Sequence, residues 1–147
     1  MQRIAIVRKE DKSIAGFKQI IKNCGFNFDQ KNPDFVLSIG GDGTFLIAER
    51  LYPGIPKVLI KESKTCIKCE DFPVDYVLNK IKEKKYKIEE FTKLEASFNG
   101  KIIKAANDIV VRNKFPTTAI RFALSGKEEL IGDGIVICTT FGSTGYY

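Results

Sequence analysis

The first half of the chain alternates short apolar runs with stretches of helical periodicity. Apolar runs of strand length occupy residues 3–7, 35–39 and 57–60. Such runs are typical of strands that are buried on both faces of a parallel sheet. Apolar positions that recur every three or four residues, as in amphipathic helices, occupy residues 14–21, 45–51 and 74–84. Strands that alternate with helices predict a doubly wound parallel α/β domain, which we place at residues 1–85.

The pattern changes near residue 86, where the helical period ends. Short runs typical of strands then follow at residues 93–98, 101–105, 108–111, 119–124 and 134–139. Asn99-Gly100, between the first two runs, is a strong signal for a two-residue hairpin loop. We therefore expect an antiparallel β domain over residues 86–147, corresponding to the first part of an incomplete β-sandwich. The predicted fold class is α/β plus all-β.

Composition narrows the possible functions. The 147 residues are 44% hydrophobic and 29% charged, an ordinary globular balance. The sequence has no run of eighteen apolar residues and no start typical of a signal peptide, which predicts a cytoplasmic protein without membrane association. The net charge of +6 would attract phosphate-bearing ligands, although a generally lysine-rich surface is the preferred explanation. Basic residues are not interleaved with aromatic ones, so no nucleic-acid partner is expected.

The sequence contains no histidine and four cysteines. Without histidine, every Ser-His, Cys-His and His-metal mechanism is excluded, and acid-base chemistry falls to carboxylates. Cys66 and Cys69 have the spacing of a metal knuckle or redox pair, but a zinc site needs two more ligands. A chance pair in a reducing compartment is the preferred interpretation, with a redox or metal role as the alternative. No residue is assigned as a metal ligand.

The strongest local motif is Gly40-Gly41-Asp42-Gly43-Thr44, which directly follows a buried strand and precedes a helix. Its glycines permit positive φ and let backbone N–H groups approach an anion, and the helix directs its positive end to the same place. We therefore expect Gly40, Gly41 and Thr44 to bind phosphate. A carboxylate is out of place there unless it accepts a proton or helps to hold Mg²⁺, which makes Asp42 the candidate catalytic residue. The alternative is that Asp42 only caps the helix.

Two later segments add to this motif. They are Ala106-Asn107-Asp108-Ile109-Val110-Val111 and the stretch from Gly132-Asp133-Gly134 to Thr144-Gly145-Tyr146. In order and spacing the three motifs resemble the NAD kinase family over residues 1–147. Lipid kinases and phosphofructokinases share the first motif, but a lipid kinase would carry a Gly-Thr-Gly-Asn-Asp stretch further on, which this sequence lacks.

The resemblance implies a reaction and a set of site residues. The family transfers a terminal phosphoryl group from ATP or polyphosphate to the adenosine ribose 2′-hydroxyl of NAD, giving NADP, with a divalent metal that we expect to be Mg²⁺. Asp42 matches the proton acceptor. The matches to substrate contacts are Gly43, the pair Asn107 and Asp108, the weaker position Thr118, Asp133 near the nicotinamide end, and Thr144, Gly145 and Tyr146 along the adenosine pocket.

Each later motif also has a purely structural explanation. Asn107-Asp108 is compatible with a turn at the entry to a strand, and Gly132-Asp133-Gly134 with an ordinary β-turn. Tyr146 is compatible with a packing role. Only their combination in this order favours function.

The sequence departs from the family in three respects. Residues 59–65 lack the Asn and the glycines of the family's Gly-x-Asn-x-Gly segment. Ile131 stands where an Arg is common, and Phe141 replaces a small hydroxyl residue next to the ligand. The family's β domain is also much longer. The shorter β region of this sequence would have unpaired strand edges, which only a longer chain or a second subunit could cover. We therefore expect a homo-oligomer. The shortened β region and the missing Asn-Gly segment also leave an alternative function, that of a non-catalytic dinucleotide-binding homologue.

Overall fold

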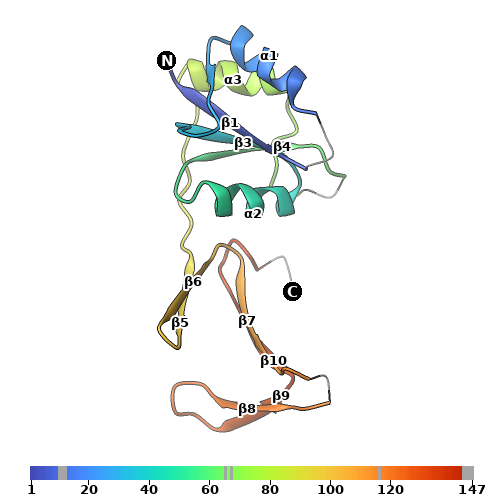
Figure 1. The fold of residues 1–147 in the computed structure, drawn as a ribbon, viewed down its shortest axis with the longest axis vertical. Helices are drawn as coiled ribbons and strands as arrows, with labels where there is room; N and C mark the ends of the chain where they lie inside the picture. The colour runs from blue at the N-terminus through green and yellow to red at the C-terminus, as the bar shows by residue number, and fades with distance from the viewer. Residues whose placement is uncertain (10–12, 65, 67, 116, 144–147) are drawn as a thin grey trace. The chain divides into compact units, whose positions relative to one another are not determined.

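The computed structural model describes residues 1–9, 13–64, 66, 68–115 and 117–143 (Figure 1). The chain divides into two compact units, Met1–Glu89 and Glu90–Tyr147, and each is described by itself.

Unit 1 is built on a four-stranded parallel sheet. Its strands are β1 (Arg3–Arg8), β2 (Asn27–Phe28), β3 (Phe35–Gly40) and β4 (Lys57–Lys61), in the order β2-β1-β3-β4. The central strand β3 is buried along its whole length, because β1 and β4 flank it and helices cover both faces. β2 was not predicted from the sequence, since two residues are too short to show a period.

Three helices cover this sheet. α1 (Ala15–Asn23) and α3 (Val74–Lys82) lie on one face, and α2 (Asp42–Leu51) lies on the other (Figure 1). The alternation along β3 explains this: Leu37 joins the larger apolar cluster with α1 and α3, whereas Val36 joins the smaller cluster with Ala48 of α2. α2 begins three residues earlier than the predicted residue 45, so Asp42 belongs to the helix. No helix in the described part of the chain is long and apolar enough to cross a membrane.

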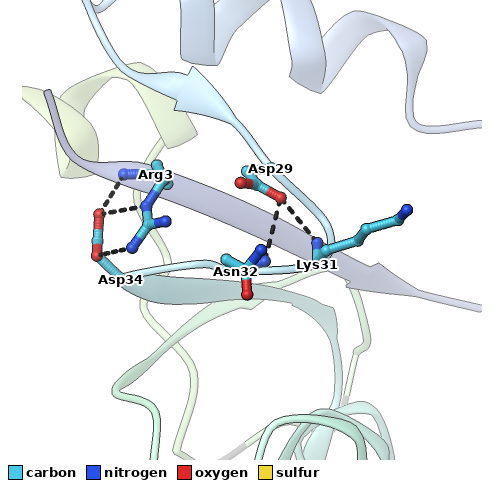
Figure 2. A network of polar contacts seen from close by, with 5 residues as sticks. All are labelled: Arg3, Asp29, Lys31, Asn32 and Asp34. Atoms are coloured by element: carbon cyan, nitrogen blue, oxygen red, sulfur yellow. Dashed lines mark hydrogen bonds and ion pairs between the residues drawn. The ribbon is translucent and has the colours of Figure 1, made fainter.

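A polar network joins the amino ends of β1 and β3 (Figure 2). The carboxylate of Asp34 accepts hydrogen bonds from the Arg3 backbone at 2.7 Å and from the Arg3 guanidinium at 2.9 and 3.3 Å. These bonds lower the pKa of Asp34 to about 2. Nearby, Asp29 Oδ1 accepts from the backbone N–H groups of Lys31 at 2.8 Å and Asn32 at 3.1 Å, which closes the turn before β3. Backbone N–H donors favour the charged form, so the pKa of Asp29 is also lowered.

Unit 2 consists of antiparallel strand pairs. These are β5 (Leu94–Phe98) with β6 (Lys101–Ala105), β7 (Asp108–Arg112) with β10 (Gly134–Cys138), and β8 (Ile120–Ala123) with β9 (Glu129–Gly132). The predicted hairpin loop is confirmed, since Asn99 and Gly100 both have positive φ between β5 and β6. β9 was not predicted, because its apolar residues Leu130 and Ile131 form a run of only two. The predicted fold class, a parallel α/β domain followed by antiparallel β structure, is confirmed.

The two units differ in how much apolar surface they bury. Among the described residues, every buried hydrophobic side chain lies between Ile4 and Ile81, in unit 1. In unit 2, Phe98 is 73% exposed and Ile102 is 64% exposed. The described part of unit 2 is therefore held mainly by strand pairing and polar contacts and has no apolar core of its own.

Candidate functional site

The glycine-rich turn lies at the carboxyl edge of the unit 1 sheet. β2 lies on one side of β1, whereas β3 and β4 lie on the other side, so the order in which successive strands are added to the sheet reverses between β1 and β3. Open α/β sheets bind ligands at such switch points. The turn occupies this position because β3 ends at Gly40 and α2 begins at Asp42.

Two of the turn's glycines serve close packing, and none of the three has positive φ. Positive φ among the described glycines occurs at Gly25, Gly54, Gly100 and Gly126, so the conformational argument from the sequence was wrong for Gly40, Gly41 and Gly43. A Cβ on Gly40 would lie 2.2 Å from Thr44 Oγ1, and one on Gly41 would lie 3.0 Å from Ser63 Cβ. A Cβ on Gly43 would meet nothing within 4 Å. Gly40 and Gly41 therefore admit close neighbours, while Gly43 leaves space open at the helix start.

Asp42 is the first residue of α2 and is exposed. The helix cap is Gly41, and no side chain makes a cap hydrogen bond, so the alternative that Asp42 caps the helix is wrong. Its carboxylate oxygen Oδ1 lies 3.3 Å from Cys66 Sγ. The first N–H groups of a helix lack the i−4 carbonyl partner that later N–H groups have. Asp42 thus places an exposed carboxylate at an end of the helix that favours negative charge.

Thr44 and Gly40 form the inner side of the turn. Thr44 is 4% exposed, and its N–H donates to Gly41 O at 2.9 Å. Its hydroxyl oxygen occupies the space where a Gly40 Cβ would stand. The structure thus shows Thr44 supporting the turn from within, with its backbone N–H already bonded.

Arg8, which was not predicted as a site residue, ends β1 at the same sheet edge. Its guanidinium pairs with Glu62 and lies 5.0 Å from the ring centroid of Phe17. The N–H of Glu62 donates to Gly40 O at 2.9 Å. Arg8 thereby holds the segment after β4 beside the glycine-rich turn. A basic residue at the end of a buried strand could have marked Arg8 in the sequence. Its partner could not have been predicted, because Glu62 is 54 residues away.

In unit 2 the structure brings two of the sequence motifs together. The Thr139 N–H donates to Asn107 O at 2.8 Å, and the Thr139 hydroxyl donates to Ala106 O at 2.6 Å and accepts from the Gly142 N–H at 2.9 Å. A Cβ on Gly142 would lie 2.3 Å from Asn107 O. Asp108 is paired with Cys138 in the β7–β10 ladder. The expected dinucleotide-binding pair therefore lies directly against the segment that leads to Thr144.

Thr118 and Asp133 lie at the other end of the β7–β10 ribbon. Asn113, which is buried, connects them: its N–H donates to Asp133 O at 2.9 Å and its amide Nδ2 donates to Thr118 O at 2.6 Å. With about 3.4 Å of rise per residue over five residue pairs, the two ends of the ribbon are roughly 14 Å apart. Asn113 is a positioning residue that the sequence does not reveal, because both contacts depend on the loop conformation.

The expected site residues thus fall into three groups. Asp42 lies with the glycine-rich turn in unit 1, Asn107 and Asp108 lie at one end of the ribbon in unit 2, and Thr118 and Asp133 lie at the other end. Phe141 packs on Phe91 with ring centroids 4.8 Å apart. The expected residues Thr144, Gly145 and Tyr146 lie outside the described residues.

Comparison with known sequences gives a consistent result. The chain is 32% identical over 154 aligned residues to an NAD kinase of Saccharolobus solfataricus and 34% identical over 131 residues to one of Sulfurisphaera tokodaii. It is 32% identical over 136 residues to a bifunctional NADP phosphatase/NAD kinase of Methanocaldococcus jannaschii, covering 24% of that protein. The first match covers 98% of this chain and 60% of the relative, and the second covers 86% and 52%. The chain thus spans about 60% of the length of the Saccharolobus solfataricus relative.

Solved structures give the same fold. A crystal structure of an NAD kinase from Archaeoglobus fulgidus in complex with ATP superimposes with a TM-score of 0.73 at 23% sequence identity. The match covers 98% of this chain and 63% of that chain. No family model matches the sequence.

Proposed function

This chain belongs to the NAD kinase family, and from that premise we propose that it phosphorylates the 2′-hydroxyl of the adenosine ribose of NAD to give NADP. The observation that carries the proposal is the exposed carboxylate of Asp42 at the start of α2, directly beyond the carboxyl end of β3. This is where an open α/β sheet presents its ligand, and the helix end favours phosphate there.

Asp42 acts in this proposal as the proton acceptor. Its carboxylate takes the proton of the ribose 2′-hydroxyl while that oxygen attacks the terminal phosphorus of the donor. The bond from this phosphorus to the bridging oxygen breaks, and the donor leaves as ADP when it is ATP. The N–H groups of Asp42 and Gly43, at the start of α2, stabilise charge on the transferred phosphoryl group in this proposal. The open space at Gly43 lets the ligand approach the backbone.

A divalent metal, Mg²⁺ in our proposal, fits the residues present. Mg²⁺ is commonly bound through one or two carboxylates together with substrate phosphates and waters. The turn offers one exposed carboxylate, that of Asp42, beside the expected phosphate position. When bound, the metal neutralises charge on the phosphates.

The unit 2 groups hold the dinucleotide in this proposal. The amide of Asn107 is suited to a base edge, and the carboxylate of Asp108 accepts from ribose hydroxyls. Their position is fixed because Thr139 ties the backbone of Ala106 and Asn107 to the following segment. Asp133, Thr118 and the stretch from Thr144 to Tyr146 complete the proposed contacts.

ATP or polyphosphate is the proposed donor, and a cytoplasmic homo-oligomer is the proposed state. The exposed apolar side chains of unit 2, such as Phe98 and Ile131, support the oligomer. Light scattering coupled to gel filtration tests it, and a monomer would contradict it.

The direct experiment is incubation of the full chain with NAD and Mg²⁺, with ATP or polyphosphate in parallel reactions. NADP is detected with an NADP-specific dehydrogenase, and omission of the donor is the control. We expect NADP to form only in complete mixtures. NAD binding without any NADP would identify the chain as a dinucleotide-binding homologue instead. The loop after β4, where Cys66 lies against Asp42, is the observation that favours that alternative. The absence of both NAD binding and NADP formation would contradict both functions.

A further inference from the structure

The segment after β4 turns back against the glycine-rich turn. Ile60 forms a β-bridge with Glu70, supported by hydrogen bonds from Lys61 N to Glu70 O at 3.0 Å and from Glu70 N to Leu59 O at 2.7 Å. On the other side, Glu62 N donates to Gly40 O at 2.9 Å. The loop between Glu62 and Glu70 is therefore closed at its base and fixed to the end of β3.

This loop carries both cysteines of the Cys-x-x-Cys pair to Asp42. Cys66 Sγ lies 3.3 Å from Asp42 Oδ1, and Cys69 Sγ lies 3.8 Å from Gly40 O. The two sulfur atoms and the carboxylate oxygen all lie within 4.8 Å of one another. Within the described part of the chain, this is the only group of three or more Cys, Asp or Glu side chains close enough to share a metal ion.

The contact between the Cys66 sulfur and the Asp42 carboxylate is van der Waals contact, not a hydrogen bond, in the disulfide form. Cys66 and Cys69 are joined as a disulfide, so Cys66 has no S–H to donate. A carboxylate oxygen and a disulfide sulfur both present lone pairs to each other. A thiol proton or a shared cation, either of which requires the reduced pair, would make this contact attractive.

We propose that the reduced pair binds a thiophilic divalent cation of the Zn²⁺ class, with Cys66, Cys69 and Asp42 as its three protein ligands. A dithiol reductant supplies two electrons and two protons to the disulfide, giving two thiols and an oxidised reductant. Metal binding then releases both thiol protons, so that two thiolates and one carboxylate face the ion. The disulfide form cannot bind the metal in this way.

The donor set and its spacing fit this metal class. Zn²⁺ takes thiolate ligands at about 2.3 Å in a tetrahedron, and Cys-x-x-Cys is a common zinc-ligand spacing. Two sulfurs on one Zn²⁺ lie about 3.8 Å apart, so the two sulfurs of the disulfide must separate on reduction before they can share the ion. Cys66 is 9% exposed, whereas Asp42 is exposed, so the ion has a protein wall on one side and an entry path on the other. Three protein ligands leave the fourth position for water or a ligand. This donor set does not suit Mg²⁺, which prefers oxygen.

The site and the proposed reaction use the same carboxylate. Mg²⁺ in the proposed reaction would be held mainly by the substrate phosphates, whereas a cation held jointly by both sulfurs and Asp42 would keep this carboxylate from the ribose proton. Such a cation and turnover would therefore exclude each other; this consequence rests on the proposed function. The existence of the metal site does not, and its test needs no substrate.

The test uses the full chain, reduced and kept without oxygen, and titrated with Co²⁺ as a spectroscopic probe. We expect a sulfur-to-cobalt charge-transfer band and tetrahedral d–d bands, saturating at one equivalent and removed by Zn²⁺. The oxidised chain serves as the first control and is expected to show neither band. Because loss of even an outer-shell partner costs 10–100-fold in metal affinity, Cys66→Ser or Cys69→Ser should each weaken Co²⁺ binding by at least about 100-fold.

Two further variants complete the design. Asp42→Asn changes an exposed side chain and should weaken binding by about 10-fold or more while the charge-transfer band remains. The matched control is the double variant Cys24→Ala/Cys138→Ala, which removes the two cysteines outside the pair and should leave the titration unchanged. The proposal is overturned if the reduced chain shows no charge-transfer band, if Asp42→Asn binds as tightly as the original chain, or if only the control variant loses binding. Circular dichroism checks that each variant is folded.

Discussion

At the scale of single residues, the glycine-rich turn combines close packing at two glycines with open space at a third. Gly40 and Gly41 are pressed against Thr44 and Ser63, whereas the space around Gly43 is open. The motif could be recognised from the sequence because its residues are contiguous, although the positive φ expected of its glycines was wrong. The sequence could not show which glycine packs closely and which has open space around it, because that depends on the position of Ser63 and on where α2 begins.

The matched substitutions Gly40→Ala and Gly43→Ala separate these roles. Gly40→Ala forces a methyl group against Thr44 and should destabilise the chain by about 1–3 kcal/mol. Gly43→Ala lies in the first turn of α2 and should leave stability unchanged or raise it by up to about 1 kcal/mol, because alanine favours helix. It should nevertheless weaken nucleotide binding. Urea denaturation measures the stability of both variants, and calorimetry measures their nucleotide affinity. Equal destabilisation by the two substitutions would contradict the different roles of Gly40 and Gly43.

The ion pair between Arg3 and Asp34 predicts a pH dependence of stability. The folded-state pKa of Asp34 is about 2, below its ordinary value of 3.8, so its contribution is fully present above about pH 4 and is lost as the pH falls toward 2. Asp34→Asn should therefore lower the urea midpoint at pH 7, and the difference from the original chain should disappear near pH 2. Arg3→Gln, which removes the partner, should behave in the same way. A difference that persisted unchanged at pH 2 would contradict the assignment.

At the scale of elements, the parallel strands and helices were predictable because burial on both faces gives long apolar runs and amphipathic helices give a clear period. β2 and β9 were missed because short pairings depend on a neighbouring strand and not on their own pattern. The start of α2 was missed because glycines resemble a loop in the sequence. The contacts of Arg8 with Glu62 and of Cys66 with Asp42 join segments 54 and 24 residues apart, which no local pattern records.

In unit 2, Thr139 joins the segment before β7 to the segment after β10, and this connection is readily tested. Its hydroxyl both donates to Ala106 O and accepts from Gly142 N. Thr139→Val removes both hydrogen bonds while keeping the shape, and should cost about 1–3 kcal/mol in local stability. Thr139→Ser keeps the hydroxyl and is the matched control. Hydrogen exchange at the Gly142 amide should accelerate in the valine variant alone, and equal exchange in both variants would exclude this role for the hydroxyl.

At the scale of the whole molecule, the two units differ in what stabilises them. Unit 1 encloses two apolar clusters, one on each face of its sheet. The described part of unit 2 buries Asn113 and Thr139 but no hydrophobic side chain. Sequence patterns predicted strands there, but burial is set by what covers a strand, and the pattern does not contain that information.

This difference predicts how the units behave in isolation. A chain of residues 1–89 should unfold cooperatively, because its core is complete within that range. A chain of residues 90–147 should show no cooperative transition and should bind a dye that reports exposed apolar surface. Thermal unfolding followed by circular dichroism makes the comparison. A sharp transition in the 90–147 chain would show that unit 2 has a core of its own.

The most direct test of the account is the rate of NADP formation by Asp42→Asn, measured at saturating NAD, ATP and Mg²⁺ alongside NAD affinity by calorimetry. The matched control is Asp75→Asn, which also changes an exposed acidic residue in the first turn of a helix, in α3. Since a general base contributes about 10²–10⁴-fold, Asp42→Asn should lower kcat at least about 100-fold with NAD affinity nearly unchanged, and Asp75→Asn should match the original chain. Undiminished NADP formation by Asp42→Asn would contradict the claim that this carboxylate takes the ribose proton.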